Sequence, residues 1–219
     1  KDVGGLDSVT SASGQALSIS TADGVSVGGA KVVKAFATMG SQVIDEPMGE
    51  GGMAAVNSKS HRDPLATSVR KIVSGGQTGA DRAALDFALR HGLEHGGWCP
   101  AGRQAEDGPL DERYALTEAD GGYAMRTRLN VRDSDGTLVL NVGELAGGTL
   151  LTTEEARRQG RPLKVVQLDA GVFEELVRDV RAWLVEHEIE VLNVAGPRES
   201  QRVGIYGLAF ALLERLGLG

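Results

Sequence analysis

The feature that most constrains the fold is an alternation of short apolar runs with stretches of helical periodicity, which begins near residue 71. Runs of strand length lie at residues 71–74, 137–142, 163–168 and 190–195. Stretches with helical spacing follow them at residues 80–91, 150–159, 172–187 and 205–216. This alternation predicts an α/β fold: a Rossmann-like parallel sheet flanked by helices and joined by right-handed crossovers.

The composition changes near residue 70. Residues 1–48 are rich in Ser, Thr, Gly and Val, and they contain short runs of strand character around the turn signal Asp23-Gly24. Residues 49–68 have no sustained period and are interpreted as a linker. We therefore predict a small β-rich or disordered N-terminal extension, a linker, and an α/β domain over residues 69–219.

Bulk properties exclude several classes of function. The formal net charge of −7 argues against general nucleic-acid binding, which usually needs a basic face. No apolar run approaches the ~20 residues of a membrane span. The single cysteine, Cys99, rules out an internal disulfide and fits a reducing compartment. The 31 glycines are about twice the usual share of ~7%, and we attribute the excess to loops between strands and helices.

The first such loop, residues 74–81, joins the first predicted strand to the first helix. Its glycines allow a ligand to approach the backbone, and the following helix start favours an anion. It is neither a GxGxxG fingerprint nor a P-loop, and a tight turn is the plain alternative. The candidate ligand residues here are Gly75, Gly76, Gln77, Thr78, Gly79 and Asp81.

Two further loops follow later strands, and the carboxyl ends of parallel strands share one edge of the sheet. Gly147, Gly148 and Thr149 repeat the strand–glycine–helix pattern, so we expect them to form one wall of a cleft whose other wall is the first loop. Thr149 is equally a candidate N-cap. After the last strand, Gly196 and Arg198 could contact a phosphate, although Arg198 could also be a plain surface arginine.

The insertion between the first helix and the second predicted strand is dense in Gly and Pro over residues 96–109, as in a lid or binding loop. Trp98 could stack on a flat ring or lie in the core. Cys99 is expected to be a small buried residue rather than a nucleophile, because no histidine is evidently placed as its base. Further candidates before the second strand are Arg126, Asn130 and Ser134. Asp133 and Asp135 could bind Mg²⁺ through a phosphate or serve as turn and cap residues.

Several runs together resemble one family: SGGQTGADRAALD, HGGWCPAGRQAEDGP, RTRLNVRDSDGTLVL, GGTLLT and VLNVAGPRES. In this order they are similar to the bacterial molybdenum carrier proteins, relatives of an algal molybdenum-cofactor carrier, over residues 69–217. That family resembles the wider Rossmannoid, lysine-decarboxylase-like set of nucleotide-binding proteins, which includes cytokinin-activating phosphoribohydrolases. Residues 14–45 resemble, more weakly, the last strands of a fasciclin-type domain.

The resemblance implies a cytoplasmic homo-oligomer that binds an anionic pterin or nucleotide and delivers molybdenum cofactor (molybdopterin) to molybdoenzymes. That cofactor is a pterin carrying a phosphate, and its metal is held by its own sulfurs, so no protein ligands to a metal are implied.

The phosphoribohydrolase motif has two glycines, a spacer and then Gly-Thr. This chain has Gly147-Gly148 followed by Thr149-Leu150, without the further Gly that precedes Thr in the motif. We therefore favour a carrier over an enzyme. The alternatives are a nucleotide-processing enzyme using Asp81, Asp133 or Glu154, and a nucleotide-derivative sensor.

Overall fold

The computed structural model describes residues 9–10, 16–17 and 65–218. The chain divides into two units, residues 1–58 and 59–219. In the first unit, the described strands β1 (Val9–Thr10) and β2 (Ala16–Leu17) form an antiparallel pair. The other predictions for residues 1–48, the fasciclin-like segment apart from residues 16–17, and most of the linker lie outside the described residues.

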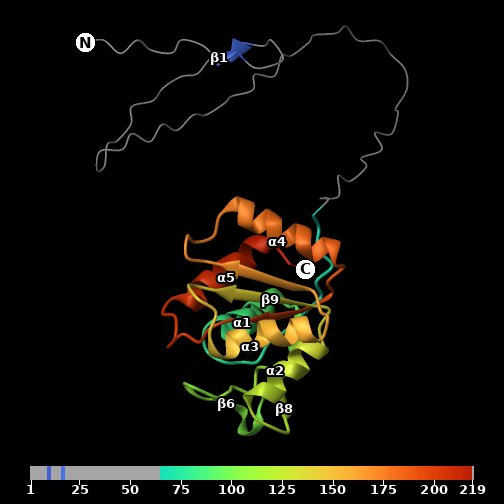
Figure 1. Cartoon of the computed structure of the whole chain (residues 1–219), viewed down its shortest axis with the longest axis vertical. Helices are drawn as coiled ribbons and strands as arrows, with labels where there is room; N and C mark the ends of the chain where they lie inside the picture. Colours follow the sequence, from blue (N-terminus) through green and yellow to red (C-terminus); the bar gives the residue numbers. More distant parts are fainter. Residues whose placement is uncertain (1–8, 11–15, 18–64, 219) are drawn as a thin grey trace, which may run out of the picture. The chain divides into compact units, whose positions relative to one another are not determined.

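The second unit is built on a five-stranded parallel sheet with the order β10-β9-β11-β3-β4 (Figure 1). This confirms the predicted α/β fold. The five strands are β3 (Lys71–Val73), β4 (Glu94–Gly96), β9 (Gly136–Asn141), β10 (Leu163–Gln167) and β11 (Val191–Ala195). Four were predicted within one or two residues of their ends, and β4 was not predicted.

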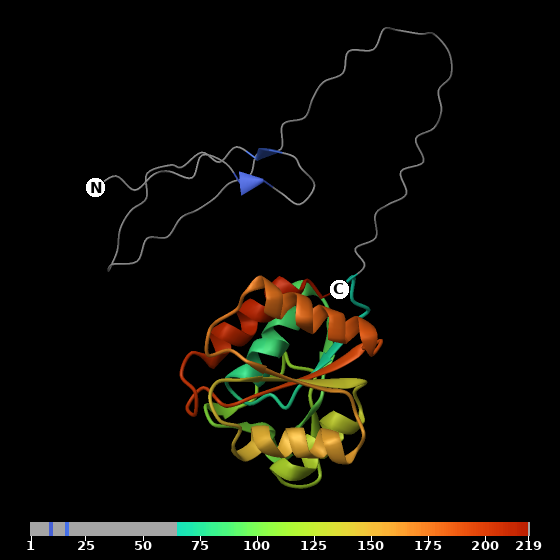
Figure 2. The same cartoon turned by 45° about the horizontal axis from the view of Figure 1, so that its top comes forward.

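Helices cover both faces of the sheet: α1 (Ala80–His91), α2 (Tyr123–Arg132), α3 (Gly147–Arg158), α4 (Glu174–Glu186) and α5 (Ile205–Leu216). Figure 2 shows α1, α4 and α5 on one side of the sheet and α2 and α3 on the other. The larger core lies under the first layer, where Ile72, Leu138 and Leu192 of the strands pack with Phe87 and Leu212 of the helices. Helix α2 was not predicted.

The strand order reverses direction between β11 and β9. From β11 the sheet continues through β3 and β4 on one side, and through β9 and β10 on the other. If the chain is read as starting at β11, the strand order is that of a Rossmann sheet, 3-2-1-4-5. The reversal leaves a crevice at the carboxyl ends of β11 and β9, which is where open α/β sheets bind ligands.

The insertion between β4 and α2 folds into short strands rather than a plain loop. It contains β5 (Trp98–Pro100), the 3₁₀ turn Ala101–Arg103, β6 (Gln104–Ala105), β7 (Gly108–Pro109) and β8 (Thr117–Ala119). Strand β5 pairs with β8, and β6 with β7. A second, smaller core forms beneath them from Leu85, Cys99, Leu110, Tyr114 and Leu116. None of the helices in the described ranges is both long and apolar enough to cross a membrane.

Candidate functional site

The start of helix α3 supplies free backbone donors at the switch point. No side chain caps the helix, and its N-cap is Ala146. The N–H groups of Gly147, Gly148 and Thr149 therefore have no partner within the helix, and they carry the positive end of its dipole. Thr149 is a buried residue inside the first turn, so of its two candidate roles that of N-cap is excluded.

The loop after β11 packs tightly against β9. A β-carbon on Gly196 would lie 2.2 Å from the carbonyl oxygen of Leu140, so glycine is needed for this close approach. Further along, the Arg202 side chain crosses to the β9 loop, where its Nε donates to the carbonyl of Val142 at 2.7 Å. Its Nη1 donates to the carbonyl of Gln201 at 3.0 Å. Arg202 thus links the two loops that flank the switch point.

These loops enclose a cleft of about 190 Å³, which we call the switch-point cleft. Its lining residues are Asn141, Glu144, Ala146, Thr149, Pro197, Gln201 and Arg202. Asn141 is buried, and its amide donates to the carbonyl of Gly143 and to Gln167 at 2.7 and 3.1 Å. The cleft therefore combines a helix start, a guanidinium and fixed polar groups, which together suit an anionic group.

The first glycine loop is filled by the protein's own side chains. A β-carbon on Gly75 would fall 1.6 Å from Nη1 of Arg126, which covers the loop from α2. That Nη1 lies 3.4 Å from Oδ2 of buried Asp81, while Nε of Arg126 is buried without a hydrogen-bond partner. Burial raises the pKa of Asp81 overall, although the nearby Arg126 charge and the Gln77 N–H act to lower it.

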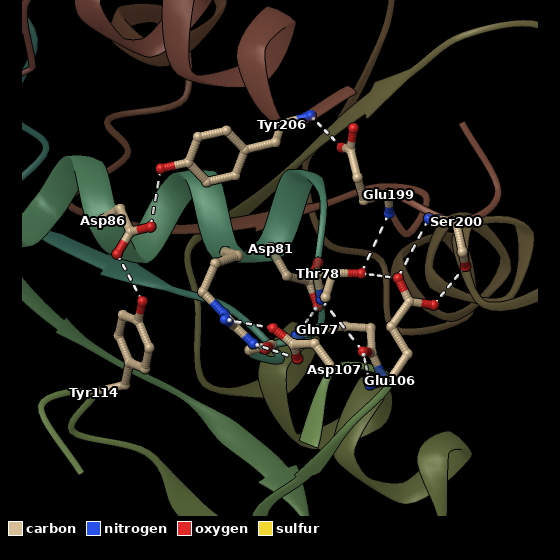
Figure 3. A network of polar contacts seen from close by, with 12 residues as sticks. Gln77, Thr78, Asp81, Asp86, Glu106, Asp107, Tyr114, Glu199, Ser200 and Tyr206 are labelled. Atoms are coloured by element: carbon tan, nitrogen blue, oxygen red, sulfur yellow. Dashed lines mark hydrogen bonds and ion pairs between the residues drawn. The ribbon is translucent and has the colours of Figure 1, made fainter. Parts of the chain in front are cut away.

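The two glycine loops line different pockets, contrary to the expectation of one shared cleft. Thr78 and Gly79 line a second pocket of about 330 Å³ beside the start of α1. Its other lining residues are Arg82, Asp107, Glu199 and Tyr206. Figure 3 shows the polar network around this pocket, which connects α1, the insertion and the loop after β11. Strand β11 lies between β3 and β9 in the sheet and separates the two loops.

Other predicted site residues are engaged in structural contacts. The amide of Asn130 clamps the backbone of Trp98, accepting from its N–H at 2.7 Å and donating to its carbonyl at 3.0 Å. The Trp98 indole donates to Asp133 at 2.8 Å, and Ser134 donates to the carbonyl of Val131 at 3.1 Å. None of Trp98, Asn130 and Ser134 lines either pocket. Arg198 lies beside the cleft residue Pro197, and its guanidinium stacks 5.2 Å from the ring centre of Tyr123.

The acidic pair before β9 also has protein partners. Asp133 is paired with Arg132 at 2.6 Å, whose hydrogen bond lowers the pKa of that carboxyl. Asp135 accepts the backbone N–H groups of Glu190 and Val191 at 3.1 and 2.7 Å. Within the described residues, no group of three potential metal ligands is present. The arrangement offers no support for the Mg²⁺ site considered above. Cys99 is buried, as expected, and burial raises the pKa of its thiol.

Of the residues that line the switch-point cleft, the sequence reasoning identified Thr149 and missed the other six, of which four are polar or charged: Asn141, Glu144, Gln201 and Arg202. Two of them had a usable signal. Asn141 is a polar residue at the end of an otherwise apolar strand, and Glu144 lies between that strand and the glycines. Arg202 differs from Arg198 only in its position along the loop, so the sequence does not distinguish between them.

Comparisons with known proteins agree with this architecture. A family model described as the circularly permutated YpsA SLOG family matches residues 72–217. Among solved structures, one named as a molybdenum carrier protein from Syntrophus aciditrophicus is 45% identical, with a TM-score of 0.67. That match covers 69% of this chain and 96% of the other. No curated protein matches the chain. The strand order read from β11 is what a circular permutation of a Rossmann sheet produces.

Proposed function

The chain belongs to the circularly permutated YpsA SLOG family, and we propose that it binds and carries an anionic, phosphorylated small molecule in the switch-point cleft. The observation that carries this proposal is the uncapped start of α3 in the wall of the cleft. A phosphate at a helix start accepts hydrogen bonds from the free N–H groups and interacts favourably with the helix dipole.

Arg202 supplies the positive charge for such a ligand. Its Nε and Nη1 donate to backbone carbonyls, which fixes the plane of the guanidinium at the edge of the cleft. Because an arginine has five N–H donors, the remaining ones are available to a phosphate. Glu144 is the acidic residue of the cleft lining, and its negative charge opposes that of Arg202. Glu144 is exposed to solvent.

Molybdenum cofactor is the ligand we propose within this class, because a similar structure carries the name of a molybdenum carrier protein. The residues present fit the phosphate of that cofactor. No aromatic side chain lines the cleft to stack on the pterin, and Trp98 is held by Asp133 instead. When bound, the cofactor would supply redox chemistry to an acceptor enzyme. We extend the proposal to a cytoplasmic homo-oligomer that passes its ligand to molybdoenzymes.

One observation supports a second candidate, an enzyme that acts on a nucleotide. Glu144 places a carboxylate in the cleft, where it could act as a general base or orient a sugar. The carboxylates considered from the sequence do not line the cleft. Asp81 is buried beside Arg126, Asp133 is paired with Arg132, and Glu154 is an exposed residue of α3. An enzyme built on this chain would therefore use Glu144.

The proposal is tested by native mass spectrometry of the protein purified from cells, followed by denaturation and a fluorescence assay for oxidised pterin. A bound pterin phosphate at a fixed ratio to protein would support the carrier. The same spectra give the number of chains in the assembly. A nucleotide in its place, or turnover of nucleoside monophosphates that is lost in Glu144→Gln, would replace the carrier with the enzyme.

A further inference from the structure

The β6–β7 hairpin is attached to the rest of the unit mainly through polar contacts. Its tip is Glu106-Asp107, and most of its residues are exposed. Ala105 is the hairpin side chain that packs on the smaller core. Little apolar burial therefore opposes opening, and segments of this kind open at a small fraction of the global free energy of unfolding.

Glu106 at the tip occupies a set of donors that belong to two other loops. Its Oε1 accepts the hydroxyl of Thr78, and it also accepts the N–H of Ser200 at 3.3 Å. Its Oε2 accepts the hydroxyl of Ser200 at 2.5 Å. Figure 3 shows the carboxylate between these two residues. Although its slight burial acts to raise it, the hydrogen bonds from Ser200 and Thr78 and the charge of Arg198 lower the pKa of Glu106 overall.

The second tip residue neutralises the neighbouring arginine. Nη1 and Nη2 of Arg82 donate to the two carboxylate oxygens of Asp107 at 3.1 and 3.2 Å. Arg82 is also anchored without the hairpin, because it donates to the carbonyl of Gly76 at 3.3 and 3.4 Å. If the hairpin opened, both carboxylates would leave together, while Arg82 would remain in place.

The space beside these groups is the second pocket, of about 330 Å³. The carboxylate that would stay behind is that of Glu199, and it is already engaged by the N–H groups at the start of α5. These are the N–H groups of Gly204 and Tyr206, at 2.5 and 3.0 Å. Opening of the hairpin would thus remove the carboxylates of Glu106 and Asp107. The hydroxyls of Thr78 and Ser200 and the N–H of Ser200 would then be left without their acceptor, near the positive charge of the arginines.

We infer that Thr78 and Ser200, flanked by Arg82 and Arg198, form a second oxyanion site that Glu106 occupies in the ligand-free protein. A phosphate-type oxyanion exchanges with the carboxylate and releases the hairpin from the second pocket. A carboxylate and a phosphate accept hydrogen bonds from the same donors, so they compete for one place. This inference is independent of the ligand proposed for the switch-point cleft.

The test is calorimetric titration of the full chain with inorganic phosphate. Glu106→Gln keeps the shape of the side chain and removes its charge, so the side chain should compete less well with phosphate for the donors of Thr78 and Ser200. We expect about tenfold tighter phosphate binding in this variant, the scale of a lost charge-assisted hydrogen bond. Glu112→Gln, an exposed glutamate of the same insertion, is the matched control and should bind phosphate as the parent does. Equal phosphate affinity in Glu106→Gln and the parent chain would overturn the inference.

Two further measurements locate the effect. Hydrogen exchange of residues 104–109 in the parent chain should quicken when phosphate is added, because the hairpin is released. Unchanged or slower exchange would mean that Glu106 is a permanent clasp and that the site is absent. In the Glu106→Gln background, Ser200→Ala should remove the added affinity, whereas Gly148→Val in the switch-point cleft should leave it. The opposite pattern would assign phosphate to the switch-point cleft alone.

Discussion

The guanidinium of Arg126 lies over Gly75 so closely that a β-carbon there would fall 2.2 Å from its Cζ. Gly75→Ala should therefore displace Arg126 and leave the carboxylate of Asp81 buried without its ion pair. We expect a loss of about 3–5 kcal/mol in the free energy of unfolding, the usual scale for breaking a buried ion pair. Denaturant unfolding measures it.

The same experiment has an internal check. Adding Asp81→Asn to Gly75→Ala removes the unpaired charge, so the double variant should recover part of the loss. Gly207→Ala is the control, because Gly207 is exposed on α5 with open space at its β-carbon. It should stabilise the protein by about 0.5–1 kcal/mol through helix propensity. A Gly75→Ala variant as stable as the parent would mean that Arg126 moves aside freely.

A substitution at Gly148 can test ligand binding without disturbing the fold. This glycine is exposed in the first turn of α3, and a β-carbon added there would point into open space. Gly148→Val should keep the fold and lower affinity for the phosphorylated ligand at least tenfold, because the added bulk blocks the free N–H groups. Titration with the ligand identified by mass spectrometry measures this. Full affinity in a folded variant would move the ligand away from α3.

Gly76 is a poor position for the same test. It has a φ of +75°, and its β-carbon would lie 2.7 Å from Leu116. Valine there should unfold part of the insertion, so a loss of binding would have two explanations.

The two arginines of the β11 loop should differ in their contribution to binding. Arg202 lines the switch-point cleft, whereas Arg198 stacks on Tyr123. Arg202→Ala should weaken binding of the phosphorylated ligand by about 1.5–3 kcal/mol and binding of its dephosphorylated form much less. Arg198→Ala should affect that ligand less. Equal losses for the two ligand forms in Arg202→Ala would argue against a phosphate contact.

Much of the fold could be predicted because its signals are local. The apolar runs at β9 and β11 and the spacing of Val177, Val180 and Leu184 in α4 show their periods directly. Strand β4 is Glu-His-Gly at the sheet edge, and only its pairing with β3 identifies it. Helix α2 buries Thr127, Asn130 and Val131, so its inner face lacks an apolar stripe.

The candidate site was harder because it depends on strand order. The sequence places glycines after β3 and β9 and suggests that both line one cleft. Strand β11 lies between those two strands in the sheet, although it is the last strand in the chain. Local sequence patterns do not show which strands are neighbours in the sheet, so this position of β11 could not be predicted. The polar groups of the first loop were similarly open to two interpretations. Gln77 accepts the N–H groups of Thr78 and Glu106 at 3.2 and 2.8 Å, a structural role that resembles a ligand contact in sequence.

Two phenols, those of Tyr206 and Tyr114, share the carboxylate of Asp86. Tyr206 donates to one oxygen at 2.9 Å and Tyr114 to the other at 2.6 Å. Burial and the Asp86 hydrogen bond raise the pKa of Tyr206 from 10.0 to about 12. The folded state therefore holds this proton at a pH where the unfolded chain has lost it. The stability contributed by the neutral phenol is fully present below about pH 10 and is lost as the pH rises towards 12.

Tyr206→Phe removes that titration. Urea midpoints measured at about pH 9 and about pH 11 should fall more in the parent chain than in the variant, because only the parent loses the contribution of Tyr206. Asp86→Asn is the complementary change: it keeps a hydrogen-bond acceptor without the charge, so the pKa of Tyr206 should fall. Phenolate absorbance in the near ultraviolet then follows the shift directly. If the parent and Tyr206→Phe lose stability equally over this interval, the Tyr206–Asp86 bond does not persist in solution.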